Sequence, residues 1–130
     1  MTIENYELAG FNLDLGIEII EWEHDRCVME LAIKPRHRNR SGAVHGGVIS
    51  TLIDAAGSHA GNHSADPAQR PRSVTVALTT QFLGQAKEGT LRAVGTRTGG
   101  GRRIFFSRVV IYADDGTEIA CGDVTGRRFS

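Results

Sequence analysis

The sequence predicts an α+β fold in which an antiparallel sheet of about six strands curves around one long helix. Three observations lead to this prediction. Residues 48–60 repeat their apolar side chains with the period of an α-helix, whereas six other stretches have the alternation or composition of strands. Most of the strand segments are joined by connections of hairpin length, which favours antiparallel pairing. At 130 residues the chain is expected to form a single domain over residues 1–130.

The N-terminal third is expected to supply a short packing segment and two strands. Residues 1–15 contain Leu8, Phe11, Leu13 and Leu15, and we expect a short helix or turn that packs over the domain. Residues 17–22 and 26–34 are predicted strands around a turn, and the second alternates Cys27, Met29, Leu31 and Ile33. Pro35 ends that strand, because proline cannot donate to a sheet, and residues 35–41 form a basic loop.

The predicted central helix has two different sides. Its apolar residues fall on one side, as expected for packing on a sheet: Val48, Ile49, Leu52, Ile53, Ala56 and Ala60. At 100° per residue, the opposite side carries Gly47, Ser50, Asp54, Gly57, Ser58 and Gly61. Each glycine in a helix costs very roughly 0.5–1 kcal/mol relative to alanine. We therefore expect a second helix or a ligand to pack closely on this face, around Asp54.

The start of this helix is suited to a negatively charged group. His45, Gly46 and Gly47 lie where backbone N–H groups have no partner within the helix and where the helix dipole is positive. Gly46 and Asp54 are eight residues apart, which places them about 12 Å apart along the axis, so they cannot act on one carbonyl group in one chain. Two helices packed antiparallel about a two-fold axis would bring them together. We therefore predict a homodimer with shared sites.

The remainder of the chain is expected to complete the sheet. Residues 62–71 form a loop and residues 73–83 a strand with clear alternation. Residues 90–98 and 103–113 are predicted strands joined by the glycines 99–101, and a tight turn at 114–116 leads to the last strand, 117–125.

The central stretch resembles the hotdog-fold acyl-CoA thioesterases of the phenylacetate-degradation, or PaaI-like, type. The resemblance lies in Asn39, Gly42, His45-Gly46-Gly47 and Asp54, with the spacing N-x2-G-x2-H-G-G-x6-D, followed by a strand of the family's kind at 73–83. It extends from about residue 16 to residue 126. It implies a hotdog fold and hydrolysis of an aromatic or medium-chain acyl-CoA to the free acid and coenzyme A. Coenzyme A is then part of the substrate, and no cofactor is expected.

The resemblance also assigns roles to individual residues. Gly46 would donate its amide to the thioester carbonyl, with Gly47 assisting, and Asp54 of the neighbouring subunit would be the base or the nucleophile. Asn39 would position substrate or water. His45 either caps the helix or polarises the thioester, and these two readings remain open.

Three further residues have weaker assignments. Thr75 is aligned approximately with a hydroxyl residue that assists near the base in relatives, although packing is the simpler explanation of a threonine in a strand. Arg102 and Arg103 follow a glycine turn that lies near the coenzyme A entrance in relatives, so we expect one of them to contact a phosphate. As a hairpin turn, the segment needs no function.

Several other classes of function are disfavoured. The net charge is zero, with eight acids and one base in residues 1–33 and seven acids and fourteen bases after them, which does not favour nucleic-acid binding. Cys27 and Cys121 fall in strand patterns and are expected to be reduced packing residues. His59 and His63 have i, i+4 spacing, but no glutamate follows the first, so no metal site is expected. No apolar stretch suits a membrane span or a signal peptide, and we expect a cytoplasmic protein.

Two rival functions and the acyl group remain open. The same fold could serve an acyl-thioester hydratase or dehydratase, or a non-catalytic protein that binds acyl-CoA. Candidate walls of the acyl pocket are Phe11, Trp22, Phe82 and Leu83. The predicted assembly is a homodimer that associates further into a homotetramer, with neither nucleic acid nor membrane as a partner.

Overall fold

The computed structural model describes residues 8–129. Residues 1–7 of the predicted N-terminal packing segment lie outside this range. The short helix α1 (Gly10–Leu15) is present, and Leu8 before it is buried. The expectation that Phe11 and Leu13 pack on the domain is wrong, because their side chains are 66% and 57% exposed. Phe11 is not among the residues that line the pocket at Gly46 described below.

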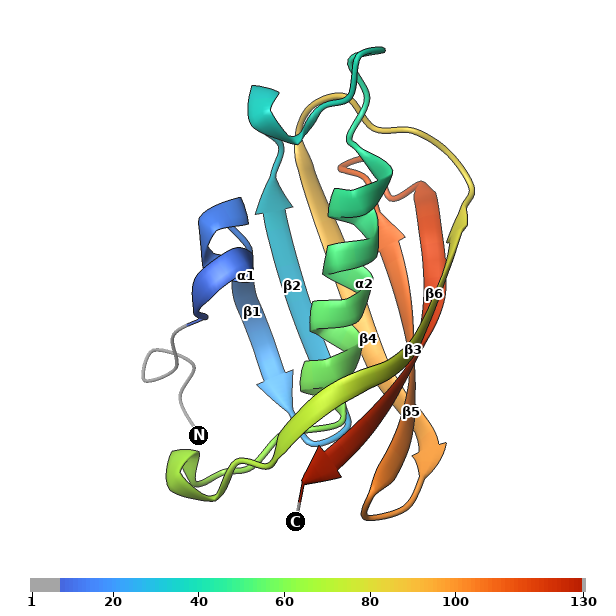
Figure 1. The fold of residues 1–130 in the computed structure, drawn as a ribbon. Coiled ribbons are helices and arrows are strands. Elements are labelled where there is room, and N and C mark those ends of the chain that lie inside the picture. The colour runs from blue at the N-terminus through green and yellow to red at the C-terminus, as the bar shows by residue number, and fades with distance from the viewer. Residues whose placement is uncertain (1–7, 130) are drawn as a thin grey trace.

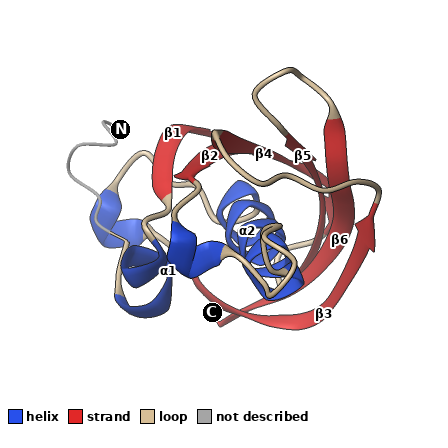
Figure 2. Ribbon diagram, turned by 90° about the horizontal axis from the view of Figure 1, so that it is seen from above, coloured by secondary structure: helices blue, strands red, loops and turns tan. Residues whose placement is uncertain are grey.

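Six strands form one antiparallel sheet that curves around the central helix α2 (Gly46–Ala60), as Figures 1 and 2 show. The spatial order is β1-β2-β4-β5-β6-β3. The strand bounds are β1 Glu18–Glu23, β2 Arg26–Ala32, β3 Arg72–Phe82, β4 Thr90–Gly100, β5 Ile104–Tyr112 and β6 Glu118–Phe129. Short 3-10 turns at Pro35–His37 and Pro67–Gln69 interrupt the two longer loops. The predicted α+β fold with one long helix is confirmed.

The apolar stripe predicted for α2 forms the helix side of the core. All six of its residues are buried, and they pack against the inward side chains of the sheet, among them Met29, Leu31, Leu91, Val109 and Ile111. Burying such side chains stabilises the fold by about 1.5–3 kcal/mol each. Cys27 is fully buried in the same core, and burial raises the pKa of its thiol to about 12. Cys121 is also a buried free thiol.

Gly57 of α2 and Gly61, the residue that caps its end, lie on a different side than predicted. A Cβ on Gly57 would lie 2.6 Å from Val124 Cγ2, and one on Gly61 would overlap the ring of Phe105. These glycines therefore allow the helix to approach its own sheet, and they are not part of an open face. Gly47, Ser50, Asp54 and Ser58 remain as the small and polar face, and the last three of them contact hydroxyl side chains of β3.

The hairpin between β4 and β5 is also placed differently. β4 continues through Gly99 and Gly100, and the turn follows at residues 101–103. The pairing of β4 with β5 shifts register between Arg97 and Gly99, which allows the strand to accommodate the extra residue. Gly100 has φ +106°, a conformation that favours glycine.

Strand β3 forms one edge of the sheet. It pairs with β6 along one side only, and Val74, Val76 and Leu78 are 47%, 58% and 39% exposed. After Arg72 the strand has no charged residue, although charges are a common protection of sheet edges. A long, uncharged edge of this kind is suited to pairing with another strand. None of the described helices is long and apolar enough to cross a membrane.

Candidate active site

The loop before α2 is held by Asn39. Its side-chain oxygen accepts from the backbone N–H of Ser41 (2.9 Å) and of Ala43 (3.2 Å). The backbone N–H of Asn39 donates to the Ala43 carbonyl (2.7 Å). Gly42 completes this turn with φ +86°, which explains a glycine at that position. The side-chain oxygen of Asn39 is thus occupied, so only its amide nitrogen can act on a substrate or water, as a donor.

His45 is the N-cap of α2. Its Nδ1 accepts from the backbone N–H of Gly47 at 2.8 Å, so the neutral ring carries its proton on Nε2 and can donate it outward. A Cβ on Gly47 would lie only 3.0 Å from this Nδ1, which explains why glycine follows. The cap also corrects the expectation for Gly47: its amide is engaged by His45 and is not open to an oxyanion.

The amide of Gly46 is in a different situation. Among the described residues it makes no hydrogen bond within the chain, and Gly46 lines a pocket of about 230 Å³ with Asn39. Phe82 from the end of β3 lines the same pocket, and a Cβ on Gly46 would lie 3.2 Å from the edge of its ring. Other walls are Val44, Ile49 and Ile119. The structure therefore brings together the donor Gly46, the amide of Asn39 and an apolar wall that includes Phe82.

Asp54 lies two turns further along α2, beside β3. Thr75 donates its hydroxyl proton to Asp54 Oδ1 at 2.5 Å, and Ser58 lies next to Thr75, with the two hydroxyl oxygens 3.5 Å apart. Because Thr75 donates its hydroxyl proton to Asp54, Ser58 is the donor in the contact between Ser58 and Thr75. Ser50 and Thr80 form a similar hydroxyl pair at 3.0 Å. Small and hydroxyl residues of α2 and β3 thus surround a partly exposed carboxylate, and Thr75 contacts it directly.

His37 is a supporting residue that the sequence pattern did not reveal. It is fully buried, its Nδ1 accepts from the Lys34 N–H (2.9 Å), and its Nε2 donates to the Leu15 carbonyl (2.7 Å). Its own carbonyl accepts from the His45 N–H at 2.8 Å. His37 therefore ties α1 to the loop that carries Asn39 and His45. Only its position two residues after a proline hinted at a fixed turn.

Arg102 and Arg103 lie away from both groups. They line a separate pocket of about 370 Å³ with Arg128 and Phe129, at the end of the molecule where α2 finishes. Arg128 is committed to the backbone: it donates to the carbonyls of Gly61 and Arg102 and to the side chain of Asn62. Within one chain, the two predicted phosphate contacts are therefore not next to Gly46.

At the end of α2, the rings of His59 and His63 both pack against Trp22. The ring of Trp22 lies 4.9 Å from that of His59 and 5.7 Å from that of His63, and its indole N–H donates to the His59 carbonyl at 2.7 Å. The helix ends at Ala60, before His63. Trp22 is buried in this cluster and is not among the residues that line the Gly46 pocket, whereas Phe82 is.

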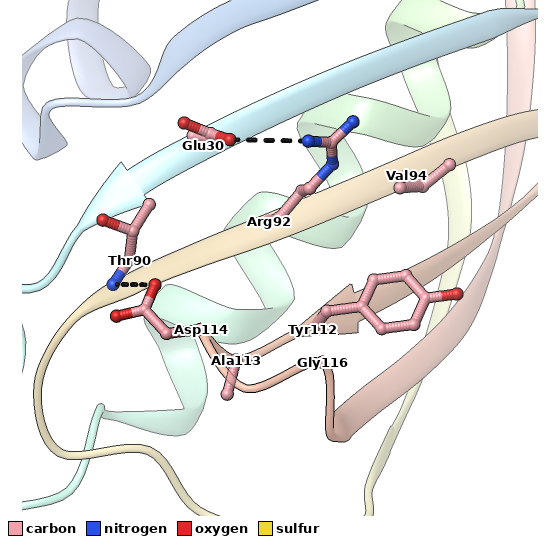
Figure 3. Close-up of a pocket in the computed structure, with 8 residues that line it drawn as sticks. All are labelled: Glu30, Thr90, Arg92, Val94, Tyr112, Ala113, Asp114 and Gly116. Carbon is pink, nitrogen blue, oxygen red and sulfur yellow. Dashed lines mark hydrogen bonds and ion pairs between the residues drawn. The ribbon is translucent and has the colours of Figure 1, made fainter.

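A pocket of about 610 Å³ belongs to another surface. It is lined by Glu30, Arg92, Tyr112 and Asp114, among others, on the face of the sheet that is turned away from α2 (Figure 3). Arg92 lies 3.8 Å from Glu30, and Asp114 accepts from the Thr90 N–H at 3.1 Å. None of the predicted site residues lines it.

Comparison with known proteins places the chain in a family. Residues 41–120 match the Thioesterase superfamily. The "Putative esterase PA0474" of Pseudomonas aeruginosa is 35% identical over 91 residues, which cover 69% of this chain and 66% of that protein. The "Putative esterase ComA2" of Bacillus subtilis is 29% identical over 107 residues, 82% of this chain and 83% of that protein.

Solved structures with the same fold include two with closely similar topology. A structure of a putative esterase from Mycobacterium tuberculosis has a TM-score of 0.84 and 25% identity, covering 92% of this chain and 96% of that one. The Escherichia coli PaaI protein from the phenylacetic acid degradation operon has a TM-score of 0.82 and 24% identity, covering 92% and 83%. The chain belongs to the thioesterase superfamily, with the hotdog fold and the thioester-hydrolase activity of that family.

Proposed function

We propose that this protein is an acyl-CoA thioesterase whose active site is shared between two subunits. The observation that carries the proposal is the separation of the two reactive groups: the open amide of Gly46 lies at the start of α2, and the Asp54 carboxylate lies about 12 Å along the axis. An antiparallel pair of α2 helices brings each Gly46 near the Asp54 of the other subunit. The uncharged, exposed edge of β3 supports this pairing, because two such edges can join into one sheet.

In this site the thioester carbonyl accepts a hydrogen bond from the amide of Gly46, and the Nε2–H of His45 is a second candidate donor. Asp54 of the partner, held by Thr75, takes a proton from water as the water oxygen attacks the carbonyl carbon. The positive end of α2 stabilises the oxyanion of the tetrahedral intermediate. The carbon–sulfur bond then breaks, the acid leaves, and the coenzyme A thiolate takes up a proton.

Asp54 can also attack the carbonyl carbon directly, forming an anhydride that water then opens. A single turnover in isotope-labelled water identifies the nucleophilic route when water opens the anhydride at the Asp54 carboxyl carbon, because only then does the label enter the Asp54 side chain. The amide nitrogen of Asn39 orients the attacking water or the substrate. Arg102 and Arg103 of one subunit contact the phosphates of the coenzyme A bound near Gly46 of the other. Two dimers associate into a tetramer.

The test is release of free thiol from a panel of aromatic and medium-chain acyl-CoA esters. We expect the Asp54→Asn variant, which keeps the side-chain shape, to lose about 10²- to 10⁴-fold in kcat. Near-full activity in Asp54→Asn would contradict the assignment. No release from any ester by the wild type would contradict the thioesterase itself and favour a binding protein.

Complementation tests whether the site is shared. Asp54→Asn and Gly46→Pro, each inactive alone, are mixed under conditions that exchange subunits. Half of the dimers then carry one of each chain, and in such a dimer one of the two sites has both native residues, so about a quarter of the wild-type activity should return. A mixture that stays inactive although exchange is verified would place both groups in one chain.

A further inference from the structure

Another pocket lies one helical turn beyond Asp54. It has a volume of about 320 Å³ and lies between the end of α2 and the start of β3. We call it the Trp22 pocket; the lining residues that matter here are Trp22, Ser58, His59, Arg70, Arg72 and Ser73. The proposed function makes no use of it.

The pocket is connected to the carboxylate through Ser58. This side chain lines the pocket and is also 3.5 Å from Thr75, which donates to Asp54. Ser58 is four residues after Asp54, so the two lie about 6 Å apart along the helix axis. A group bound at Asp54 therefore has the Trp22 pocket as its neighbour.

The lining of the pocket is positively charged. Arg70 and Arg72 are its charged residues, and no carboxylate is among the described residues that line it. The Arg70 guanidinium lies 4.6 Å from the centre of the Trp22 ring, a cation–π contact that fixes its position. Burial is the main cause that lowers the pKa of both His59 and His63, and the charge of Arg70 adds to it, so both rings are uncharged at neutral pH. The two arginines thus give the pocket a positive charge.

The pocket also presents a hydroxyl donor. Asn62 accepts from Arg128 (3.2 Å) and donates to the Ser58 carbonyl (2.9 Å) and to Ser73 Oγ (2.6 Å), so its side chain is locked. Because Ser73 Oγ accepts from Asn62, its own proton can be donated to another acceptor. A guanidinium beside a hydroxyl donor is suited to a carboxylate.

We propose that the Trp22 pocket receives the far end of the acyl group and favours acyl groups that end in a carboxylate. This deepens the proposed thioesterase function and rests on it. A chain of the length of a glutaryl group bridges the single turn between Asp54 and the pocket. The phosphates of coenzyme A are the other anionic groups of the substrate, but the long pantetheine arm separates them from the thioester, whereas this pocket adjoins the proposed reaction centre.

The test compares glutaryl-CoA with pentanoyl-CoA, which differ in the terminal group at similar length. In the wild type we expect kcat/KM for glutaryl-CoA to be higher by about tenfold or more. Arg72→Gln should lower kcat/KM for glutaryl-CoA about ten- to hundredfold and leave pentanoyl-CoA within about twofold, and Arg72→Lys should restore part of the loss. Arg92→Gln, on the outer face of the sheet, is the matched control and should change neither ester.

Equal turnover of the two esters by the wild type would overturn the proposal while leaving the thioesterase in place. An equal loss for both esters in Arg72→Gln would also overturn it, because the arginine would then contact the coenzyme A phosphates. If no ester is hydrolysed, the proposed function fails. The carboxylate preference of the Trp22 pocket is then tested by the thermal stabilisation that the two intact esters and free coenzyme A each produce. Stronger stabilisation by glutaryl-CoA that is lost in Arg72→Gln supports the carboxylate site, and equal stabilisation by all three overturns it.

Discussion

The two ends of α2 present different kinds of chemical groups. At the amino end, backbone atoms dominate: the Asn39 turn and the His45 cap engage the N–H groups around Gly46 and leave its own amide open. At the carboxyl end, side chains dominate, with Arg70 stacked on Trp22 and Arg72 beside it. The amino end is suited to stabilising a developing oxyanion, and the carboxyl end to selecting a substrate. The difference implies that substitutions at the amino end should reduce kcat for every ester, whereas those at the carboxyl end should alter preference.

The strongest test of the amino end removes one N–H group. Proline is accepted at the first position of a helix, and His45 has φ −61° and ψ 137°, a conformation compatible with a following proline. Gly46→Pro should therefore fold and should lower kcat about 10²- to 10³-fold, the usual effect of losing an oxyanion donor. Gly46→Ala is the control, since it introduces similar crowding against Phe82 but keeps the N–H. Equal losses in both variants would mean that crowding, and not the amide, is responsible.

The support behind the amino end should appear as stability. In His37→Phe the Lys34 N–H and the Leu15 carbonyl lose their buried partner, and each unsatisfied group costs about 1–3 kcal/mol. We expect the free energy of unfolding in denaturant to fall by about 2–4 kcal/mol. His24→Phe is the control, because the side chain of His24 is 82% exposed and its substitution should change little. If the two variants are equally stable, His37 does not hold the loop.

Asp54 lies between the two ends of α2, and substitutions of Thr75 test how its carboxylate is held. Thr75→Val removes the 2.5 Å hydrogen bond at nearly constant volume, and kcat should fall about tenfold, the effect expected for a hydrogen bond to a charged group. Thr75→Ser keeps the hydroxyl and should retain most of the activity. A loss in the serine variant as large as in the valine variant would assign Thr75 to packing, the simpler reading of its position in a strand.

The smallest expected effect concerns pH at the carboxyl end. Burial lowers the pKa of His59 in the folded protein below its ordinary value of 6.5. The unfolded chain therefore binds more protons as pH falls through this range, so His59 should reduce the free energy of unfolding as the medium becomes more acidic. Measured between neutral pH and about pH 5, the wild type should lose more stability than His59→Gln. Identical pH profiles would show that His59 does not contribute.

The sequence alone determined those features that depend on spacing along the chain. The 3.6-residue period placed all six apolar residues of α2 in the core, and alternation located the strands. The spacing of Asn39, His45, Gly46 and Asp54 led to the thioesterase family, and the rise per residue was sufficient to separate Gly46 from Asp54. These quantities depend on local backbone geometry, so no knowledge of the folded chain was needed.

Tertiary structure decided whatever depended on contacts between distant segments. Gly57 and Gly61 were assigned to an open face, yet Val124 and Phe105 of the sheet require them, because the reach of opposing side chains is not encoded in the helix itself. The contact of His37 with the Leu15 carbonyl and the contact of Thr75 with Asp54 likewise arise only when distant segments of the chain pack together. Whether such a hydrogen bond forms depends on differences of a few tenths of an ångström in the distance between donor and acceptor. For residues far apart in sequence, the residue pattern does not specify this distance.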